Sequence, residues 1–211
     1  MATTQLTLYN GALRELGERK LASLSEDRKP RRLLDDVWDG ALKATLEEAD
    51  WKFAMRAAKL IYEPSFTPSF GFTRQFSKPD DFVRLSRMCV DERMYTPLTD
   101  YMEEAGFWFA DLDDLYVGYV SNGASYGGDM TLWPESFVKM FELYLASSIV
   151  LSLEQSVSTE EALQKKYNRA KTEAKSKDAQ AGPTQFFPAG SWTRSRSQGR
   201  SDRGNRGSLI G

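Results

Sequence analysis

The chain has 211 residues, of which 41% are hydrophobic and 27% charged, and its net charge is −2. This length predicts one compact body with appendages rather than two full-sized domains. No apolar run approaches the roughly 18 residues that span a bilayer. The first residues show no secretory signal pattern. We therefore expect synthesis in a host cytoplasm and no membrane partner.

Histidine is absent, and cysteine occurs once, as Cys89. Histidine is the commonest general base and the usual partner of a nucleophilic serine or cysteine, and it is also the commonest metal ligand. Its absence disfavours most hydrolase mechanisms, so we expect no enzymatic activity, no cofactor and no metal. Cys89 cannot form an intrachain disulfide, and its place in the strand-like run 82–90 favours a buried thiol.

Two helices are predicted in the N-terminal quarter. Apolar residues recur at spacings of three and four within residues 3–17, and Gly17 is placed to end that helix. Pro30 suits the first turn of a second helix, whose apolar stripe continues to Ala49. We expect this second helix to end at Asp50 or slightly beyond.

From residue 60 the pattern changes to short alternating stretches between proline, serine and glycine, which is typical of strands and loops. The segment 121–129 is rich in turn-forming residues and predicts a loop that projects from the fold. We expect one small antiparallel sheet inserted between the helices. Its candidate strands are 71–76, 82–88, 93–96, 106–110 and 115–120.

Two further helices are predicted at 134–155 and from Ser158 to about Ala179, where Ser158 and Glu161 have the spacing of a capping box. The predicted fold class is mainly α with an inserted β region (α+β), namely an antiparallel helical bundle, a small antiparallel sheet domain and an extended C-terminal arm. The expected domains are 1–59 for the N-terminal helices, 60–132 for the β-rich region, 133–180 for the C-terminal helices and 181–211 for the Arg-rich arm.

Several groups could carry chemistry, and each has a structural alternative that we favour. The acidic cluster 111–114 offers hard-cation ligands, but a polar hairpin connection is the better interpretation. Glu103 and Asp113 could serve as the paired carboxylates of a glycosidase. Gly123, Gly127 and Gly128 lack the lysine and the flanking elements of a phosphate-binding loop. Six aromatic residues could stack on bases but are more typical of core packing. They are Trp51, Phe53, Phe70, Phe72, Phe76 and Trp108.

The segment from Pro183 onward has few apolar residues and predicts an arm that cannot fold alone. Its arginines suit the phosphates of nucleic acid or the carboxylates of a partner protein. Its aromatic residues are suited to anchoring the arm on a partner surface. The candidate docking residues are Phe186, Phe187, Trp192, Arg194, Arg196, Arg200, Arg203 and Arg206.

Most of residues 5–180 resembles the phage head-to-tail adaptor family, including the tail tubular protein A group of short-tailed phages. The resemblance is carried by the order and spacing of several short segments rather than by one motif. Lys78 stands where leucine is more usual in the family, and the Arg-rich ending from Ser191 is less typical. The segments are Asn10–Gly17, Lys20–Asp27, Val37–Trp38, Ala49–Ala54, Phe76–Leu85 and Trp133–Ala146 with the following helix to Ala179.

The resemblance implies a virion structural protein that forms a ring, usually of twelve copies, between the portal and the tail nozzle or tail tube. It also implies that the ring lines the DNA exit channel and that the C-terminal extension reaches along the portal. The expected partners are therefore the portal, the distal tail protein, further copies of this chain and, transiently, viral DNA. The alternative is a nucleic-acid-binding module that acts through the basic C-terminal tail.

Overall fold

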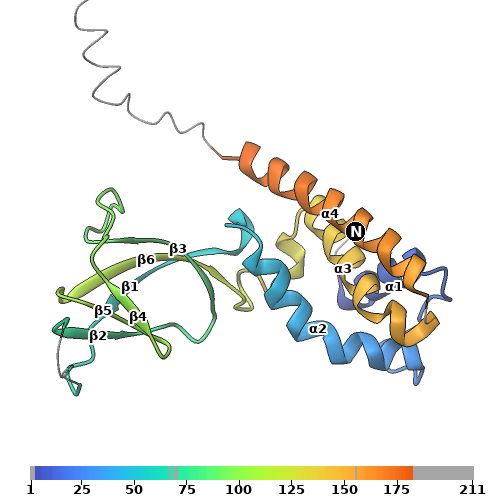
Figure 1. Ribbon diagram of the computed structural model, residues 1–211, viewed down its shortest axis with the longest axis horizontal. Coiled ribbons are helices and arrows are strands. Elements are labelled where there is room, and N and C mark those ends of the chain that lie inside the picture. The colour runs from blue at the N-terminus through green and yellow to red at the C-terminus, as the bar shows by residue number, and fades with distance from the viewer. Residues whose placement is uncertain (1–2, 67, 69–70, 155, 183–211) are drawn as a thin grey trace, which may run out of the picture. The chain divides into compact units, whose positions relative to one another are not determined.

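The fold is α+β, as the sequence predicts, and a computed structural model describes residues 3–66, 68, 71–154 and 156–182. Within these described residues, four helices form one part, called here the helical body, and six strands form the β region (Figure 1). The helices are α1 Gln5–Glu15, α2 Lys29–Glu47, α3 Glu135–Glu154 and α4 Val157–Gln180. The strands are β1 Met55–Ile61, β2 Arg74–Ser77, β3 Phe82–Cys89, β4 Met102–Glu104, β5 Phe107–Ala110 and β6 Asp114–Ser121.

Helix α3 is the centre of the helical body, and both α1 and α2 pack against it. Its residues Phe137, Phe141 and Leu145 are fully buried. By length and composition α3 could also cross a membrane, but 56% of that stretch is buried inside the protein. The core helix of a folded domain passes the same test of length and composition, so this stretch is weak evidence for a membrane span.

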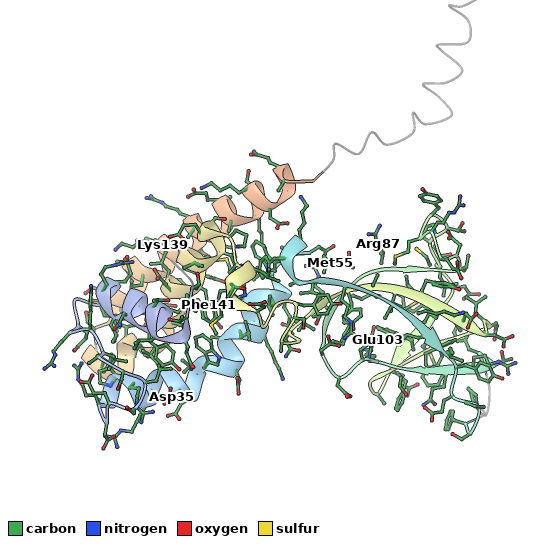
Figure 2. All side chains as sticks on the ribbon, turned by 180° about the vertical axis from the view of Figure 1, so that it is seen from behind. Asp35, Met55, Arg87, Glu103, Lys139 and Phe141 are labelled. Atoms are coloured by element: carbon green, nitrogen blue, oxygen red, sulfur yellow. The ribbon has the colours of Figure 1, made fainter. Side chains whose placement is uncertain are left out.

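Aromatic side chains pack α2 and the connections before β1 and before α3 against α3. The ring of Trp38 lies 5.2 Å from that of Phe141, and Phe137 has Trp51 at 5.0 Å and Trp133 at 4.9 Å, all edge to face. Such pairs add about 0.5–1.5 kcal/mol each beyond the area that they bury. Figure 2 shows Phe141 among the helices and Met55 where the chain enters the first strand.

The helix boundaries differ from the prediction at two places. Helix α4 begins at Val157, and the Oγ of Ser156 accepts a hydrogen bond from the N–H of Thr159 at 3.3 Å. Ser156 therefore occupies the capping position, and the predicted capping box of Ser158 and Glu161 is wrong. Helix α2 ends at Glu47, before the predicted end at Asp50.

The described part of the β region contains two three-stranded antiparallel sheets, not the single sheet that the sequence predicts. Their strand orders are β1-β6-β3 and β2-β5-β4. Because β5 and β6 belong to different sheets, residues 111–113 connect the sheets, and the predicted hairpin there is wrong. Strand β1 begins at Met55, inside the 1–59 segment that the sequence assigns to helices.

The core of the β region lies between residues of both sheets. Phe76 and Trp108 come from one sheet, and Leu115, Val117 and Tyr119 come from the other. The predicted packing role is therefore confirmed for Phe76 and Trp108, as it is for Trp51 in the helical body. Cys89 is buried as predicted, with 2% of its surface exposed. Phe70 lies outside the described residues.

The loop 122–129 packs against the helical body instead of projecting, so that prediction is wrong. Trp133 donates a buried hydrogen bond from Nε1 to the carbonyl of Gly127 at 2.9 Å. A Cβ atom on Gly127 would lie 2.3 Å from the carbonyl oxygen of Ser121 and 2.9 Å from Leu46. Only glycine allows the loop, the sheet and α2 to approach this closely.

Candidate functional site

The predicted docking residues of the arm lie outside the described residues. The structure therefore gives no geometry for them, and the arm remains a prediction from sequence. These residues are Phe186, Phe187, Trp192, Arg194, Arg196, Arg200, Arg203 and Arg206.

The acidic cluster is occupied by hydrogen bonds and ion pairs. Asp111 accepts from the backbone N–H of Thr73 at 2.7 Å, and Asp113 accepts from Nε of Arg74 at 3.0 Å. Asp114 pairs with Lys59 on the neighbouring strand. Within the ranges that the structure describes, no group of three or more acidic, cysteine or histidine side chains could hold a metal ion.

Glu103, a candidate carboxylic acid of a glycosidase, pairs with Lys78 and accepts a hydrogen bond from Nε1 of Trp108 at 3.0 Å. Figure 2 shows Glu103 among the strands. The hydrogen bond from Lys78 holds the pKa of Glu103 below its ordinary value. A general acid needs a raised pKa, so this environment works against that role.

The loop glycines make no phosphate cradle, because their N–H groups already have acceptors inside the loop. The N–H of Gly123 donates to Oγ of Ser121, and the N–H of Gly127 donates to the carbonyl of the same serine at 3.0 Å. The N–H of Gly128 donates to the carbonyl of Gly123 at 3.0 Å. A phosphate group would need these donors to be free.

A polar network around Asp81 lies beside this loop. Its carboxylate accepts hydrogen bonds from Arg56 at 2.7 Å, from the hydroxyl of Tyr119 at 3.0 Å and from the hydroxyl of Ser121. Burial opposes ionisation of Asp81, but these donors outweigh it, and its pKa lies below the ordinary value. The backbone N–H of Asn122 also donates to the carbonyl of Asp81. The network therefore connects β1, β6 and the loop that contacts the helices.

Helix α4 is attached to the helical body through lysine–glutamate pairs. Glu48, directly after α2, pairs with Lys171 at 3.1 Å and Lys175 at 2.9 Å. Glu15, at the end of α1, pairs with Lys166 of α4 and with Lys139 of α3. Three side chains of α4 are buried, namely Leu163, Tyr167 and Ala174. A narrow apolar stripe with charge pairs on both flanks therefore holds this helix.

Residues 90–97, called here the β tip, expose an aromatic side chain. Tyr95 is 79% exposed, the largest value among the exposed large hydrophobic residues of the described chain. The sequence prediction of a strand at 93–96 is wrong, because these residues form a turn. The carboxylate of Asp91 accepts from the backbone N–H groups of Tyr95 at 3.1 Å and Thr96 at 2.7 Å. Asp91 is the sequence signal for this turn, since aspartate side chains commonly bond to N–H groups further along a turn.

A hollow lies between α3 and α4. Its volume is about 260 Å³, and four of its lining residues are charged. Lys139 of this set is labelled on the helical body in Figure 2. The sequence has no local pattern that indicates this hollow, because the lining residues of its two walls are more than 30 residues apart in the chain. Its lining residues are Glu135, Ser136, Lys139, Ala170, Glu173 and Lys177.

No protein-family model matches the chain, and no curated protein matches its sequence. Function is therefore inferred from the residues of this chain and their contacts. The described surface offers three features for that purpose, which are the exposed β tip, the hollow between α3 and α4, and the charge-paired helix α4.

Proposed function

We propose that this chain is a structural head-to-tail adaptor of a tailed bacteriophage. In this role it forms a ring, of about twelve copies in the family that it resembles, which joins the portal to the tail nozzle or tail tube. The ring lines the channel through which DNA leaves, and the protein resides in the virion at the head–tail junction. It acts by binding, without a catalytic step.

One observation carries this proposal. Segments of the resemblance that are far apart in sequence meet in one aromatic core, where Trp51 and Phe53 lie 5.0 Å and 4.8 Å from Phe137. Trp133 contacts the same ring, and Trp38 contacts Phe141. The segments of the resemblance therefore contribute to one shared core. Their order and spacing in the sequence, together with this shared core, support the adaptor role.

The proposed division of roles follows the two parts of the molecule and the arm. The helical body forms much of the ring, the β region faces the distal tail, and residues 183–211 bind the portal. An arm that is presented many times on one ring gains avidity without strong individual contacts. Its aromatic residues supply anchors, and its arginines pair with carboxylates.

The test is to mix the purified full chain with a purified portal ring and to image the complex. We expect a ring of this protein on one face of the portal. Deleting residues 183–211 should leave a folded chain whose binding to the portal is at least tenfold weaker. Two variants separate the contributions, one replacing Phe186, Phe187 and Trp192 with alanine and one replacing the five arginines with glutamine. No complex with the full chain would refute the adaptor proposal, whereas unchanged binding after the deletion would refute only the arm's role.

A nucleic-acid-binding role is the second candidate, and the basic stretch of α4 bears on it. Between Lys165 and Lys177 this helix has six cationic residues and one acid, Glu173. Four of those lysines are held in ion pairs, which leaves Lys165 and Arg169 without an ion pair among the described residues. DNA binding would therefore depend mainly on the arm. A gel shift at low salt that disappears when the five arm arginines are replaced would support it.

A further inference from the structure

A carboxylate is buried where α1 packs on α3. The side chain of Glu142 in α3 is 10% exposed and occupies the space that a side chain at Gly11 of α1 would need. Among the described residues its carboxylate accepts one hydrogen bond, from Nη2 of Arg14 at 3.3 Å. The Arg14 side chain is 60% exposed. Water screens so exposed a cation, so Arg14 offsets only part of the cost of ionising a buried carboxylate.

A second carboxylate at the same contact has the opposite balance. Glu15, the last residue of α1, has a side chain that is 15% exposed and pairs with Lys139 of α3 and Lys166 of α4. Its burial is close to that of Glu142, but it has two cations where Glu142 has one. The hydrogen bond from Lys139 holds the pKa of Glu15 below its ordinary value, and Lys166 adds to this effect while burial opposes it. Burial instead raises the pKa of Glu142.

The charged groups that act on Glu142 come from both helices of the contact. Arg14 of α1 and Lys139 of α3 favour its ionised form. Glu135 of α3 and Glu15 of α1 oppose ionisation, because like charges repel. The burial of Glu142 outweighs its two cations, and the neighbouring acids add to that effect.

The two carboxylates make the α1 contact depend on pH in opposite directions. The folded-state pKa of Glu142 is raised, so its contribution is fully present below the ordinary glutamate value of about 4.3 and is lost as the pH rises through the folded value. The folded-state pKa of Glu15 is lowered, so its contribution is fully present above that ordinary value and is lost as the pH falls through the folded value. The two contributions are therefore greatest together near the ordinary value.

We infer that α1 is a proton-linked element of the fold, which attaches to α3 most firmly at mildly acidic pH and opens more often as the pH rises. An isolated helix of 11 residues is marginal in water, so α1 depends on this contact for its stability. Arg14 moderates the response, since it is the cation that bonds to Glu142. The inference goes beyond the adaptor role and does not depend on it.

Hydrogen–deuterium exchange of the full chain between about pH 4.5 and about pH 8 tests the inference, with each rate corrected for the intrinsic pH dependence of amide exchange. We expect the protection of α1 to fall as the pH rises. Glu142→Gln removes the charge and keeps a similar shape, so it should raise this protection several-fold at the upper pH and change it little at the lower one. The matched control is Glu161→Gln, at an exposed site of α4 without an ion pair among the described residues.

Equal protection of α1 in the wild-type protein and in Glu142→Gln at the upper pH would overturn the inference. A gain of the same size in β5 would also overturn it, because the effect would then be one on global stability. Carbon-13 NMR of the carboxyl groups is a second measurement that needs no substitution. The Glu142 signal should titrate above the ordinary glutamate value and the Glu15 signal below it, and a Glu142 midpoint at or below that value would contradict the inference. Both measurements use this chain alone, so their failure would leave the adaptor proposal standing.

Discussion

Gly11 is glycine because the side chain of Glu142 occupies the space beside it. A Cβ atom at Gly11 would lie 1.8 Å from Oε1 of Glu142 and 2.0 Å from its Cδ, which is far inside contact distance. Glu142 lies on α3, is 8% exposed, and pairs with Arg14 of α1 at 3.3 Å. Burial raises the pKa of Glu142, with Arg14 and Lys139 opposing that shift. The close approach of α1 and α3 therefore depends on the missing side chain.

Gly11→Ala should destabilise the protein by about 1–3 kcal/mol, because Glu142 must leave its position or α1 must move. The matched control is Gly40→Ala, at an exposed position of α2 where a Cβ atom meets nothing within 4 Å. That change should stabilise the protein by about 0.5–1 kcal/mol, since alanine favours a helix interior over glycine. Denaturant unfolding measures both. A loss in Gly11→Ala that Glu142→Ala does not relieve would contradict this explanation.

At the scale of the elements, α4 differs from the other helices in how it is held. Lys52, which follows α2, donates from its backbone N–H to Asp178 at 3.1 Å and from its side chain to the carbonyl of Ala179 at 3.2 Å. Lys171 and Lys175 meet Glu48 on the same side. Desolvation opposes ionisation of Glu48, but its two lysines outweigh this and hold its pKa below the ordinary value. The C-terminal half of α4 should therefore be the part of the helical body most sensitive to salt.

Glu48→Gln should weaken the attachment of α4 by about 1 kcal/mol, because partly buried pairs to two lysines are lost. Hydrogen–deuterium exchange should report faster exchange in the C-terminal half of α4, with little change in α3. The matched control is Glu173→Gln, since Glu173 pairs with Lys177 inside α4 and makes no ion pair to the body among the described residues. Equal effects of the two substitutions would rule out Glu48 as the attachment point.

For the whole molecule, the connection between the helical body and the β region depends on polar and glycine contacts as well as on apolar packing. Val120 belongs to the helical core, while the adjacent Tyr119 belongs to the core of the β region. Asp81 binds Tyr119 and Ser121, and the loop that follows contacts Leu46 and Trp133. Loss of the Asp81 carboxylate should therefore affect both parts.

The pH dependence of stability should reveal this network. The folded-state pKa of Asp81 is depressed, so its contribution is fully present above the ordinary aspartate value of about 4 and is lost as the pH falls through the lower folded value. Asp81→Asn should lower stability at neutral pH and reduce the loss of stability below about pH 4. Denaturant unfolding at stepped pH is the measurement, with Asp36→Asn at an exposed site of α2 as control. Parallel pH profiles for Asp81→Asn and the wild-type protein would exclude the role.

The sequence predicts the helices because their apolar residues recur at local spacings that one element satisfies by itself. Pro30 marks the first turn of α2, and the apolar positions of α3 give a long core helix. Local signals were weaker for the strands. β1 follows directly after a short helical turn, and its pairing partners in β6 are more than 50 residues away, so no neighbouring residue reveals it.

The sequence alone determined the α+β class, the apolar faces of the helices and the burial of Cys89, since periodicity and composition specify which residues must leave water. Only the tertiary structure decided that two sheets form, that the loop at Gly127 packs inward, and that α3 and α4 border a charged hollow. These features depend on contacts between residues far apart in the chain, and such contacts leave no local pattern to read. Local propensity favours a strand at 93–96, but the two hydrogen bonds to Asp91 outweigh it.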